Sequence, residues 1–516
     1  MGTAAAADDG LSMSAAAFDC DVLVVGLGPV GAVLTALLAE RGMGVIALDK
    51  DAAPYPLPRA VHFDHEIMRV FQQLGIADQV SRHARDLPDY EFRAADGQVL
   101  MKLRPPRETS SGWGGGYMFH QPGLEAVLRE RLAAMPSADV RLGQRFDSLV
   151  QDSEGVTAEV TTGAGAATVR TRYLVGCDGA SSPVREAIGG GLFDYQFDEP
   201  WLVVDVRVPA DCRVPAVNIQ LCDPARPTTC VLSGPGRHRW EFMLLPGETV
   251  EAMLDDAVVH DLIRPWDCGP VQIERKAVYR FHGLVANRWR AGRIMIAGDA
   301  AHQTPPFAGQ GMCAGIRDAA NLAWKLDAVL RGAASDALLD TYQAEREPHV
   351  RAAIELAIGM GRVVCTLDRD AAAQRDAAML AAQAGGDPAL PATRPPPFAS
   401  GGVLAGSPGA GELFPQPTAG EAPLRLDDRL GDEAVLIARA PIGETPAGVR
   451  LLGLDAEDLA PFRAALLVWL DRRGVEAVLI RPDRYVFGSG APRILLDAWE
   501  ASLNPRTPAL AESEAR

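Results

Sequence analysis

The chain has 516 residues, which is more than one compact core holds, so we expect two or three domains. Hydrophobic residues make up 48% and charged residues 23%, a balance typical of soluble globular proteins. The 50 basic and 67 acidic residues give a net charge of −17, which argues against binding nucleic acid or an anionic membrane and leaves any anionic substrate to local arginines.

The start of the chain and its cysteines indicate a cytoplasmic protein. Residues 1–17 lack the basic segment of a signal peptide and carry two aspartates, so we predict a disordered tail. The uncharged run 22–39 is long enough for a membrane span, but the glycines and the proline within it argue against one. The eight cysteines include no CxxC pair and no zinc-like spacing, so we expect free thiols and no metal site.

A dinucleotide-binding pattern opens the chain. In order it comprises a buried strand, a GxGxxG turn, a helix and a second strand with a terminal acid: residues 21–25, Gly26, Gly28 and Gly31, residues 32–41, residues 44–48, and Asp49. A bare GxGxxG is weak evidence, but the complete unit predicts a dinucleotide site with Asp49 near a ribose. Because only one such unit occurs, we expect one tightly bound nucleotide, with any nicotinamide a transient visitor.

The residues after this unit suggest a loop near the ligand. Arg59 is well placed to meet a pyrophosphate or a flavin edge, and an ordinary surface arginine is the weaker alternative. His62, Asp64 and His65 are metal ligands by type, but no matching cluster elsewhere supports a metal site. Residues 90–119 alternate like strands.

Further strands follow in the middle of the chain. Gln121 begins a predicted helix that runs to about residue 135. A later strand ends at Asp178-Gly179, and a helix begins just after it. Residues 190–285 are mostly strands, which predict an antiparallel sheet that could form one wall of a substrate pocket.

The stretch 293–326 combines a strand, a carboxylate, a loop and a helix. The strand ends at Gly298 and Asp299, and the loop contains Pro305, Pro306, Gly309, Gly311 and Met312. Asp299 can accept a hydrogen bond from a ribityl or ribose hydroxyl, and the N–H groups that precede the helix can face an anionic ring or oxygen. On this stretch alone, a purely structural strand–loop–helix unit remains an equal alternative.

Taken together, the GxGxxG turn, Asp178-Gly179 and Gly298-Asp299 with its loop resemble the single-component FAD-dependent aromatic hydroxylases, the flavin monooxygenases of the para-hydroxybenzoate hydroxylase type. The resemblance covers residues 20 to about 365. It implies that Asp49 binds the adenosine ribose of FAD, that Asp178 lies near FAD and the nicotinamide path, and that Asp299 binds the ribityl chain. It also implies that Arg59 and Gln121 contact the flavin and that the loop 305–312 lies against its ring.

Four segments extend the match to the branch that acts on 3-(3-hydroxyphenyl)propionate: PRAVHFDHEIMRVFQQLGIADQV, IQLCDPARP, WEFMLLPGE and LLDTYQAEREPHV. The resemblance implies that NADH or NADPH reduces the flavin and that O2, held as a C4a-hydroperoxide, hydroxylates a phenolic acid ortho to its hydroxyl during aromatic catabolism. Residues 109–117 and 366–425 depart from the pattern. Alternatives are a bulkier polyketide-like phenol in biosynthesis and an FAD-dependent dehydrogenase without oxygen chemistry.

Candidate catalytic and substrate-binding residues follow from chemical type alone. A base that removes the phenolic proton could be His62, Tyr117 or His302, although a structural role is favoured for each of them. Arg226 or Arg213 could pair with a substrate carboxylate, and either could instead be a solvated charge at a strand edge.

The predicted fold is α/β: a Rossmann-like FAD-binding domain with an inserted, mainly antiparallel substrate domain and a C-terminal domain that resembles thioredoxin. The expected boundaries are 18–190 and 286–365 for the FAD-binding domain, with substrate-domain strands near 90–120, 191–285 for the substrate domain, 366–425 for a linker and 426–516 for the C-terminal domain. Lacking CxxC, that last domain cannot run dithiol exchange, so packing or homodimerisation is its plainer role.

Overall fold

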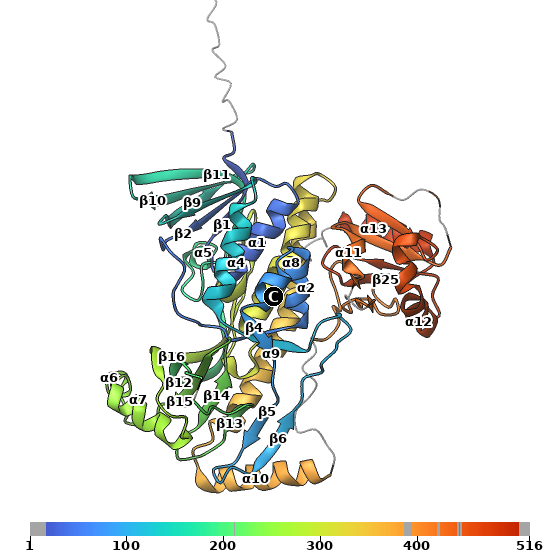
Figure 1. Ribbon diagram of the computed structural model, residues 1–516. Coiled ribbons are helices and arrows are strands. Elements are labelled where there is room, and N and C mark those ends of the chain that lie inside the picture. Colours follow the sequence, from blue (N-terminus) through green and yellow to red (C-terminus); the bar gives the residue numbers. More distant parts are fainter. Residues whose placement is uncertain are drawn as a thin grey trace, which may run out of the picture.

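The computed structural model describes residues 17–210, 212–385, 395–420, 424–440, 443 and 446–504 (Figure 1). The predicted disordered tail therefore lies, except for residue 17, outside the described residues. A body built on two large sheets carries a separate C-terminal unit at one side, drawn in orange and red in Figure 1.

The first sheet is organised around parallel strands. Its path runs β17-β18-β11-β1-β2-β8, and the antiparallel pair β9 and β10 extends from β11. The bounds are β1 Cys20–Val25, β2 Val45–Asp49, β8 Ala138–Leu142, β9 Arg145–Gln151, β10 Val156–Thr162, β11 Gly165–Gly176, β17 Arg290–Ala291 and β18 Ile294–Ile296. β1 and β2 read as continuous apolar runs because helices cover this part of the sheet.

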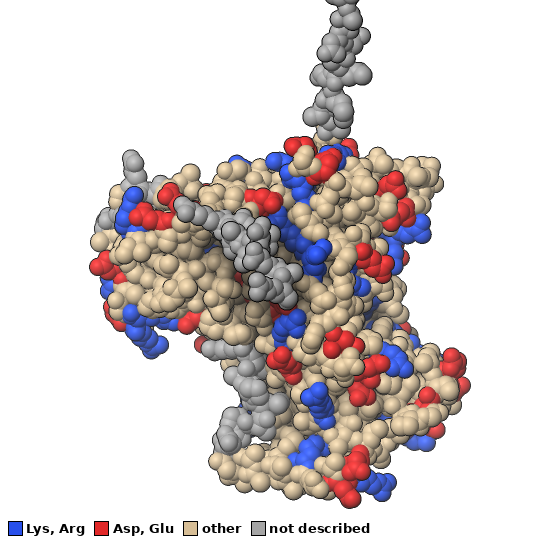
Figure 2. All heavy atoms as spheres, turned by 180° about the vertical axis from the view of Figure 1, so that it is seen from behind, with Lys and Arg blue, Asp and Glu red and all other residues tan. Residues whose placement is uncertain are grey.

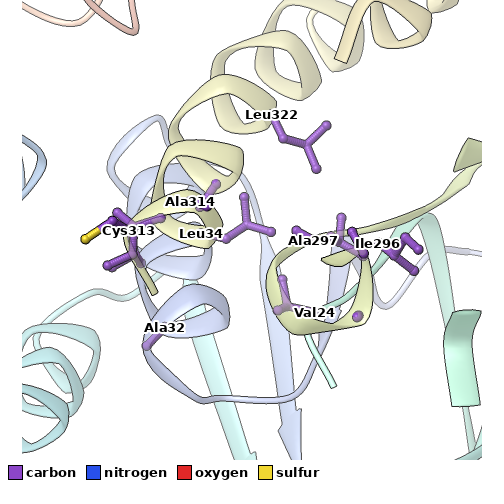
Figure 3. Packing of buried hydrophobic residues seen from close by; sticks show 14 of the residues in the cluster. Val24, Ala32, Leu34, Ile296, Ala297, Cys313, Ala314 and Leu322 are labelled. Carbon is purple, nitrogen blue, oxygen red and sulfur yellow. The ribbon is translucent and has the colours of Figure 1, made fainter. Parts of the chain in front are cut away.

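Helices α1 (Pro29–Glu40), α4 (Gln121–Ala133) and α8 (Gly311–Leu330) pack beside this sheet. Figure 3 shows side chains of β1, α1, β18 and α8 meeting in one core, with Leu34 of α1 close to Ala314 of α8. The residues that recur at helical spacing in α8, including Leu322 and Leu326, are buried.

The second sheet has the order β19-β16-β12-β15-β14-β13-β5-β6 and is antiparallel except for the pair β13 and β5. Its strands are β5 Tyr90–Arg93, β6 Val99–Leu103, β12 Leu192–Arg207, β13 Asn218–Leu221, β14 Thr228–Leu232, β15 Arg237–Met243, β16 Gln272–Ala286 and β19 His302–Gln303. A small third sheet joins β7 (Gly116–Phe119) to β3 (His62–Asp64) and β4 (Ala84–Asp86). Residues 116–119 therefore pair with the segment after Asp49 and lie outside the second sheet.

Further helices surround these sheets. They are α2 His65–Gln73, α3 Ala77–Ser81, α5 Pro183–Ala187, α6 Val250–Met253, α7 Asp256–Ile263 and α9 Thr341–Val364. The segment expected as a linker contains a further helix, α10 (Arg369–Ala384), which packs beside β6 (Figure 1). Its alanine-rich composition favours a helix, because alanine has the highest helix propensity.

The C-terminal unit has its own four-stranded sheet, in the order β23-β22-β24-β25. The bounds are β22 Ala434–Ala438, β23 Val449–Gly453, β24 Ala477–Ile480 and β25 Val486–Gly490, with helices α11 Asp427–Leu430, α12 Arg463–Arg473 and α13 Pro492–Leu503 and a short hairpin of β20 Thr418–Ala419 and β21 Leu424–Arg425. β22 pairs parallel with β23 and antiparallel with β24. Buried residues such as Val435 and Ile480 give this unit a core of its own.

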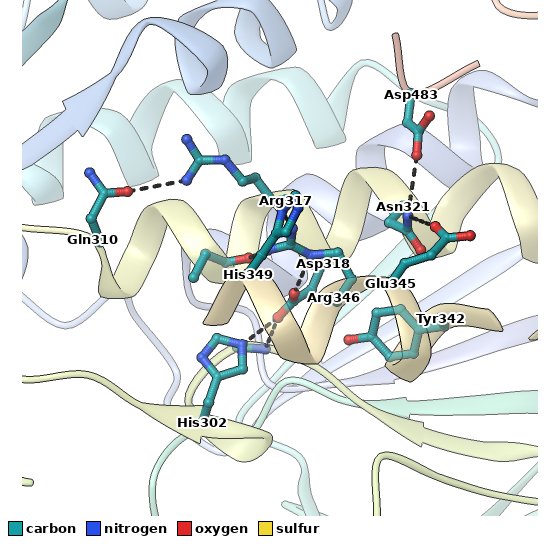
Figure 4. Close-up of polar contacts among 12 residues, drawn as sticks. His302, Gln310, Arg317, Asp318, Asn321, Tyr342, Glu345, Arg346, His349 and Asp483 are labelled. Carbon is teal, nitrogen blue, oxygen red and sulfur yellow. Dashed lines mark hydrogen bonds and ion pairs between the residues drawn. The ribbon is translucent and has the colours of Figure 1, made fainter. Parts of the chain in front are cut away.

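Buried charges join the C-terminal unit to α8 and α9. Arg481 contacts Glu345 of α9 at 2.8 Å and Asp483 at 2.5 Å, and Lys325 of α8 contacts Glu345 at 2.9 Å. The side chains of Arg481, Glu345 and Lys325 are 0% exposed. Asp483 also accepts a hydrogen bond from Asn321 at 3.2 Å (Figure 4). These contacts fix the C-terminal unit against helices α8 and α9 of the body.

The surface carries acidic and basic side chains close together. The face in Figure 2 shows both kinds interspersed among uncharged residues. Within the described part of the chain, no helix has both the length and the apolar character needed to cross a lipid bilayer. Free thiols are present at Cys20, Cys177, Cys222, Cys230, Cys268, Cys313 and Cys365.

We predict that Arg481→Leu will lower the stability of the protein strongly. The substitution removes the cation shared by two buried carboxylates, so we expect the free energy of unfolding to fall by about 3–5 kcal/mol. The midpoint of thermal unfolding of the purified protein measures this change.

Arg493→Ala is the matched control, because it removes an exposed ion pair. Arg493 is 81% exposed and lies 3.1 Å from Asp497, so its loss should leave the midpoint nearly unchanged. Equal shifts in the two variants would contradict a special role for the buried pairs.

Candidate functional site

The carboxyl ends of four neighbouring parallel strands, β18, β11, β1 and β2, meet at one edge of the first sheet. Val25 of β1 is paired with Leu48 of β2 and with Gly176 of β11, which is in turn paired with Ile296 of β18. Each of the strands β2, β11 and β18 is followed or ended by an aspartate: Asp49, Asp178 and Asp299. Such an edge is where open α/β sheets bind ligands.

The glycine turn after β1 is too crowded for other residues at two positions. Gly26 has φ +95°, and a Cβ there would lie 2.4 Å from the Cys177 carbonyl oxygen. A Cβ at Gly31 would lie 2.0 Å from the Gly26 carbonyl oxygen. Gly28 has open space instead, and no side chain caps the N-terminus of α1 that follows it. This N-terminus can therefore receive an anionic group.

Asp49 is held at the end of β2 by backbone donors. One carboxylate oxygen accepts a hydrogen bond from the N–H of Leu27 at 2.8 Å, and the other accepts from the N–H of Asp51 at 2.9 Å. The side chain is half-buried, and each carboxylate oxygen can accept a further hydrogen bond from a hydroxyl group.

The other two aspartates keep acceptor capacity for a ligand. Asp178 accepts a hydrogen bond from the N–H of Val184 at 3.0 Å, while its Oδ1 is buried without a partner among the described residues. Burial raises the pKa of Asp178, although hydrogen bonds to Ser182 and Val184 oppose the shift. Asp299 is exposed at the same edge. Both can bind sugar or ribityl hydroxyl groups.

Gln121 and Arg59 are linked through the backbone. The side-chain oxygen of buried Gln121 accepts hydrogen bonds from the N–H groups of Arg59 at 3.0 Å and Ala60 at 2.7 Å. Arg59 is exposed, with its guanidinium 4.8 Å from the centre of the Tyr55 ring. Gln121 therefore orients the segment that carries Arg59, and the arginine is free to meet a ligand.

The loop before α8 brings backbone groups toward the same edge. Pro306 begins a short turn, and Gly309 has φ +62°, a left-handed conformation that favours glycine. Gln310 precedes Gly311 and Met312 in the first turn of α8, and no side chain caps this N-terminus. The free N–H groups can face an electron-rich ring or oxygen.

A cavity of about 1480 Å³ opens beside this loop and reaches helix α12. Residues from the loop, the second sheet and the third sheet line its inner part, among them His62, Tyr90, Met118, Asn218, Phe307 and Gln310. Aromatic and aliphatic groups with a few polar atoms suit an aromatic ligand.

Of the three predicted bases, His62 lines this cavity. Its Nδ1 lies 3.1 Å from the Gly309 carbonyl oxygen, so Nδ1 carries the proton and Nε2 is the acceptor in the neutral ring. Nε2 is buried without a partner among the described residues, and a Cβ at Gly116 would come within 2.7 Å of it. Burial lowers the pKa of His62, although Gly309 and Asp64 oppose the shift.

The other two predicted bases have structural partners. His302 is buried, with its Nε2 2.6 Å from Asp318 Oδ2 (Figure 4). Tyr117 stacks on Phe63 with ring centres 5.2 Å apart, and its hydroxyl accepts a hydrogen bond from the N–H of Gly114 at 2.9 Å. Neither is among the residues that line the cavity, so the geometry favours His62 alone.

The two predicted carboxylate-binding arginines lie elsewhere. Arg226 makes a two-pronged contact with Glu248, at 2.6 and 2.7 Å, and is not among the residues that line the cavity. Arg213 is exposed. The geometry therefore favours neither as a substrate-binding residue. Arg107, which sequence reasoning did not single out, does line the cavity.

Sequence reasoning also missed the ion pairs beside His62. Arg317 of α8 lies 2.5 Å from Asp64 and 2.6 Å from Glu66. Burial acts to raise the pKa of Asp64, but the Arg317 guanidinium outweighs it and holds that pKa below its usual range. The HFDHE and GIRDA segments contain these residues, but no local pattern indicates that they pair.

Similar proteins are known from sequence and from solved structures. A probable NADH-specific resorcinol 4-hydroxylase from Rhodococcus jostii is 38% identical, over 91% of each chain. A 3-(3-hydroxyphenyl)propionate/3-hydroxycinnamic acid hydroxylase from Mycolicibacterium gilvum is 35% identical, over 91% of this chain and 88% of its own. The structure of aklavinone-11 hydroxylase with FAD and aklavinone matches with a TM-score of 0.76 and 26% identity, over 94% of this chain and 99% of the other.

The residues at the sheet edge fit FAD. An uncapped helix N-terminus can receive its diphosphate, and the unpartnered Oδ1 of Asp178 can accept from a hydroxyl. The FAD binding domain family matches residues 19–357, which is more than half of the chain. The resemblance to FAD-dependent aromatic hydroxylases is thus confirmed. The chain belongs to the FAD binding domain family and is an FAD-dependent aromatic hydroxylase.

Proposed function

We propose that the chain uses NADH and O2 to hydroxylate a phenol that carries a substituent at position 3, ortho to the phenolic hydroxyl. The names of two relatives share this substrate pattern, because resorcinol has a second hydroxyl at position 3 and 3-(3-hydroxyphenyl)propionate has its side chain there. NADH is favoured over NADPH because the name of one relative specifies it. The observation that carries the proposal is the position of His62, whose Nε2 has no partner among the described residues, in the wall of a cavity that also contains Tyr90 and Phe307.

In this proposal the FAD lies along the edge formed by the parallel strands. Its diphosphate meets the turn at Gly26, Gly28 and Gly31, and Asp49 binds the adenosine ribose. Asp299 binds the ribityl chain. The exposed side chain of Asp299 and the open space at Gly28 support this orientation.

The remaining cofactor contacts lie closer to the ring. Asp178 and Arg59 approach the central part of FAD, and the loop with Pro306, Gly309, Gly311 and Met312 faces the isoalloxazine ring. Gln121 acts through the backbone of Arg59, which its side chain holds by two hydrogen bonds. The uncapped N-terminus of α8 supports the position of the ring, because its N–H groups can stabilise negative charge there.

FAD, when bound, supplies the redox chemistry with NADH and O2. The chain must orient the phenol and remove its proton, because a phenolate ring is a better nucleophile than a phenol. His62 is neutral near pH 7, since burial lowers its pKa, and its Nε2 can accept that proton. The apolar wall, including Met118 and Phe307, limits the entry of water.

The charges near His62 favour an uncharged substituent on the phenol. Asp64 and Arg317 are the charged groups that act on His62, and Arg317 already contacts Asp64 and Glu66. A substrate carboxylate beside His62 would compete with Asp64 and Glu66 for Arg317. Arg107 lines the same cavity and could bind a carboxylate at the end of a side chain, so a phenolic acid would place its acid group away from His62.

A bulkier phenol is the second candidate substrate. The cavity of about 1480 Å³ extends from the loop to α12, which leaves space for a substrate larger than resorcinol beside the flavin ring. The structural similarity to an enzyme crystallised with the polycyclic compound aklavinone points the same way.

For the C-terminal unit we propose a thioredoxin-like arrangement. β22 pairs parallel with β23 and antiparallel with β24, α12 joins β23 to β24, and α13 follows β25, all of which support it. The sequence has no cysteine after Cys365, so this unit has no thiol for redox exchange. Its buried contacts with α8 and α9 support a packing role, and homodimerisation remains a prediction.

We predict that His62→Gln will lower kcat/KM by about 10²–10⁴-fold at pH 7, the range that general base catalysis contributes. In the unaltered enzyme kcat/KM should fall only as the pH drops below 6.5, because the lowered pKa keeps His62 neutral above that value. In the variant this acid limb should vanish, and activity should rise toward high pH as the free phenol ionises.

The dependence of kcat/KM on pH in Tyr117→Phe distinguishes Tyr117 from His62 as the base. We expect this variant to retain the acid limb. If Tyr117→Phe loses the limb while His62→Gln keeps it, His62 is not the base.

A substrate panel tests the proposed phenol. We expect product formation coupled to NADH oxidation with resorcinol, less with 3-(3-hydroxyphenyl)propionate and least with a fused-ring phenol. Arg107→Gln should raise the KM of the acid alone, by about tenfold for the loss of one charge-assisted contact, and Arg226→Gln is the control. Coupled product with the fused-ring phenol alone would favour the second candidate.

A further inference from the structure

A hydrogen-bonded path leads from the C-terminal unit into the site. Tyr485 lies in the tight turn between β24 and β25, where Arg484 has φ +69°. Its ring stacks on Phe398 with centres 4.3 Å apart, and its hydroxyl donates to Glu66 Oε1 at 2.7 Å. Burial and the neighbouring Glu66 raise the pKa of Tyr485 well above its usual value, so the hydroxyl remains a donor at neutral pH.

The path continues from Glu66 to α8. The second oxygen of Glu66 accepts from Nε of Arg317 at 2.6 Å. The two terminal nitrogens of Arg317 donate to Asp64 at 2.5 Å and to the side-chain oxygen of Gln310 at 3.2 Å. Figure 4 shows Arg317 extending along α8 toward Gln310. One guanidinium therefore holds three side chains from two segments.

Both ends of this path touch the proposed reaction site. Gln310 closes the loop that faces the flavin ring and precedes the first turn of α8. Asp64 is two residues from His62 and is one of the charges that act on it. The direction in which Arg317 points thus bears on the loop and on the base together.

The Tyr485 hydroxyl orients the Glu66 carboxylate, to which Arg317 also donates. Tyr485 donates to Oε1 of Glu66 and Arg317 donates to Oε2, so the two donors together fix the orientation of this carboxylate. Without the Tyr485 hydroxyl, the carboxylate can rotate and form a two-pronged contact with Arg317, which is the stronger arrangement for a guanidinium. A second contact with Glu66 would turn the whole guanidinium, and we expect its contact with the neutral Gln310, the longest of the three, to weaken.

We propose that Tyr485 is a positioning residue for hydroxylation: through Glu66 and Arg317 it sets the Gln310 end of the loop beside the flavin. The C-terminal unit thereby acts on the reaction through the side chains that link it to the loop. This inference rests on the proposed position of the flavin ring at that loop.

Tyr485→Phe tests the inference, because it removes the hydroxyl and keeps the ring that stacks on Phe398. We expect the variant to bind FAD and to show a different change in visible flavin absorbance when resorcinol is added without NADH. During turnover the ratio of hydroxylated product to hydrogen peroxide should fall by roughly tenfold. Glu66→Gln weakens the next link and should change both readouts in the same direction, even if Tyr485→Phe folds poorly.

Tyr173→Phe is the matched control. Tyr173 also donates a hydrogen bond to a carboxylate at 2.7 Å, that of Asp336, but it lies on β11 away from the loop. This variant should keep the spectrum and the product ratio of the unaltered enzyme. A fall in the thermal midpoint of Tyr485→Phe with both readouts unchanged would reduce Tyr485 to a structural role and overturn the inference.

Gln310→Ala separates this inference from the proposed function. If Gln310→Ala changes the flavin spectrum while Tyr485→Phe and Glu66→Gln do not, the loop faces the flavin but the C-terminal unit does not set it. If none of the three variants changes the spectrum, the position of the ring at this loop is itself wrong.

Discussion

The carboxylate of Asp318 is the contact on which the arrangement of the site depends. Its Oδ2 accepts hydrogen bonds from the N–H of Gly298 at 3.1 Å and from His302 at 2.6 Å, and its Oδ1 accepts from Arg346 at 2.9 Å. Burial acts to raise the pKa of Asp318, but His302 and Arg346 outweigh it and lower that pKa. An ionised Asp318 therefore connects three elements to one turn of α8. They are the end of β18, strand β19 and helix α9.

Helix α8 is unusual because its polar residues point inward. An amphipathic helix at a protein surface normally turns its charges to solvent. In α8 the residues Arg317, Asp318, Asn321 and Lys325 are all buried, and their partners come from the segment after Asp49, from α9 and from the C-terminal unit. The C-terminal unit thus satisfies polar groups that the first domain would otherwise leave buried and unpaired, which is costly.

The parts of the site that could be predicted from the sequence are those with local signals. The strand, glycine turn and helix around Gly28, and the carboxylates that follow strands, are each encoded within a few neighbouring residues. The partners of Arg317 could not be predicted in this way, because 253 residues separate it from Asp64 and no periodicity connects them. The glycines and prolines of residues 366–425 indicate a linker. The alanines of this segment, however, are concentrated in α10, and alanine favours helices.

Buried ion pairs are a poor explanation for stability alone, because removing two charges from water offsets most of their attraction. An apolar seam of the same size would hold the C-terminal unit to α8 at least as well. Charged side chains add a defined orientation, because the planar guanidinium of an arginine can pair with its partners in only a few geometries. At this seam the direction matters because Arg317 is shared between Glu66, which Tyr485 contacts, and Gln310 in the loop. The ionic character of the seam is therefore best explained by its connection to the loop.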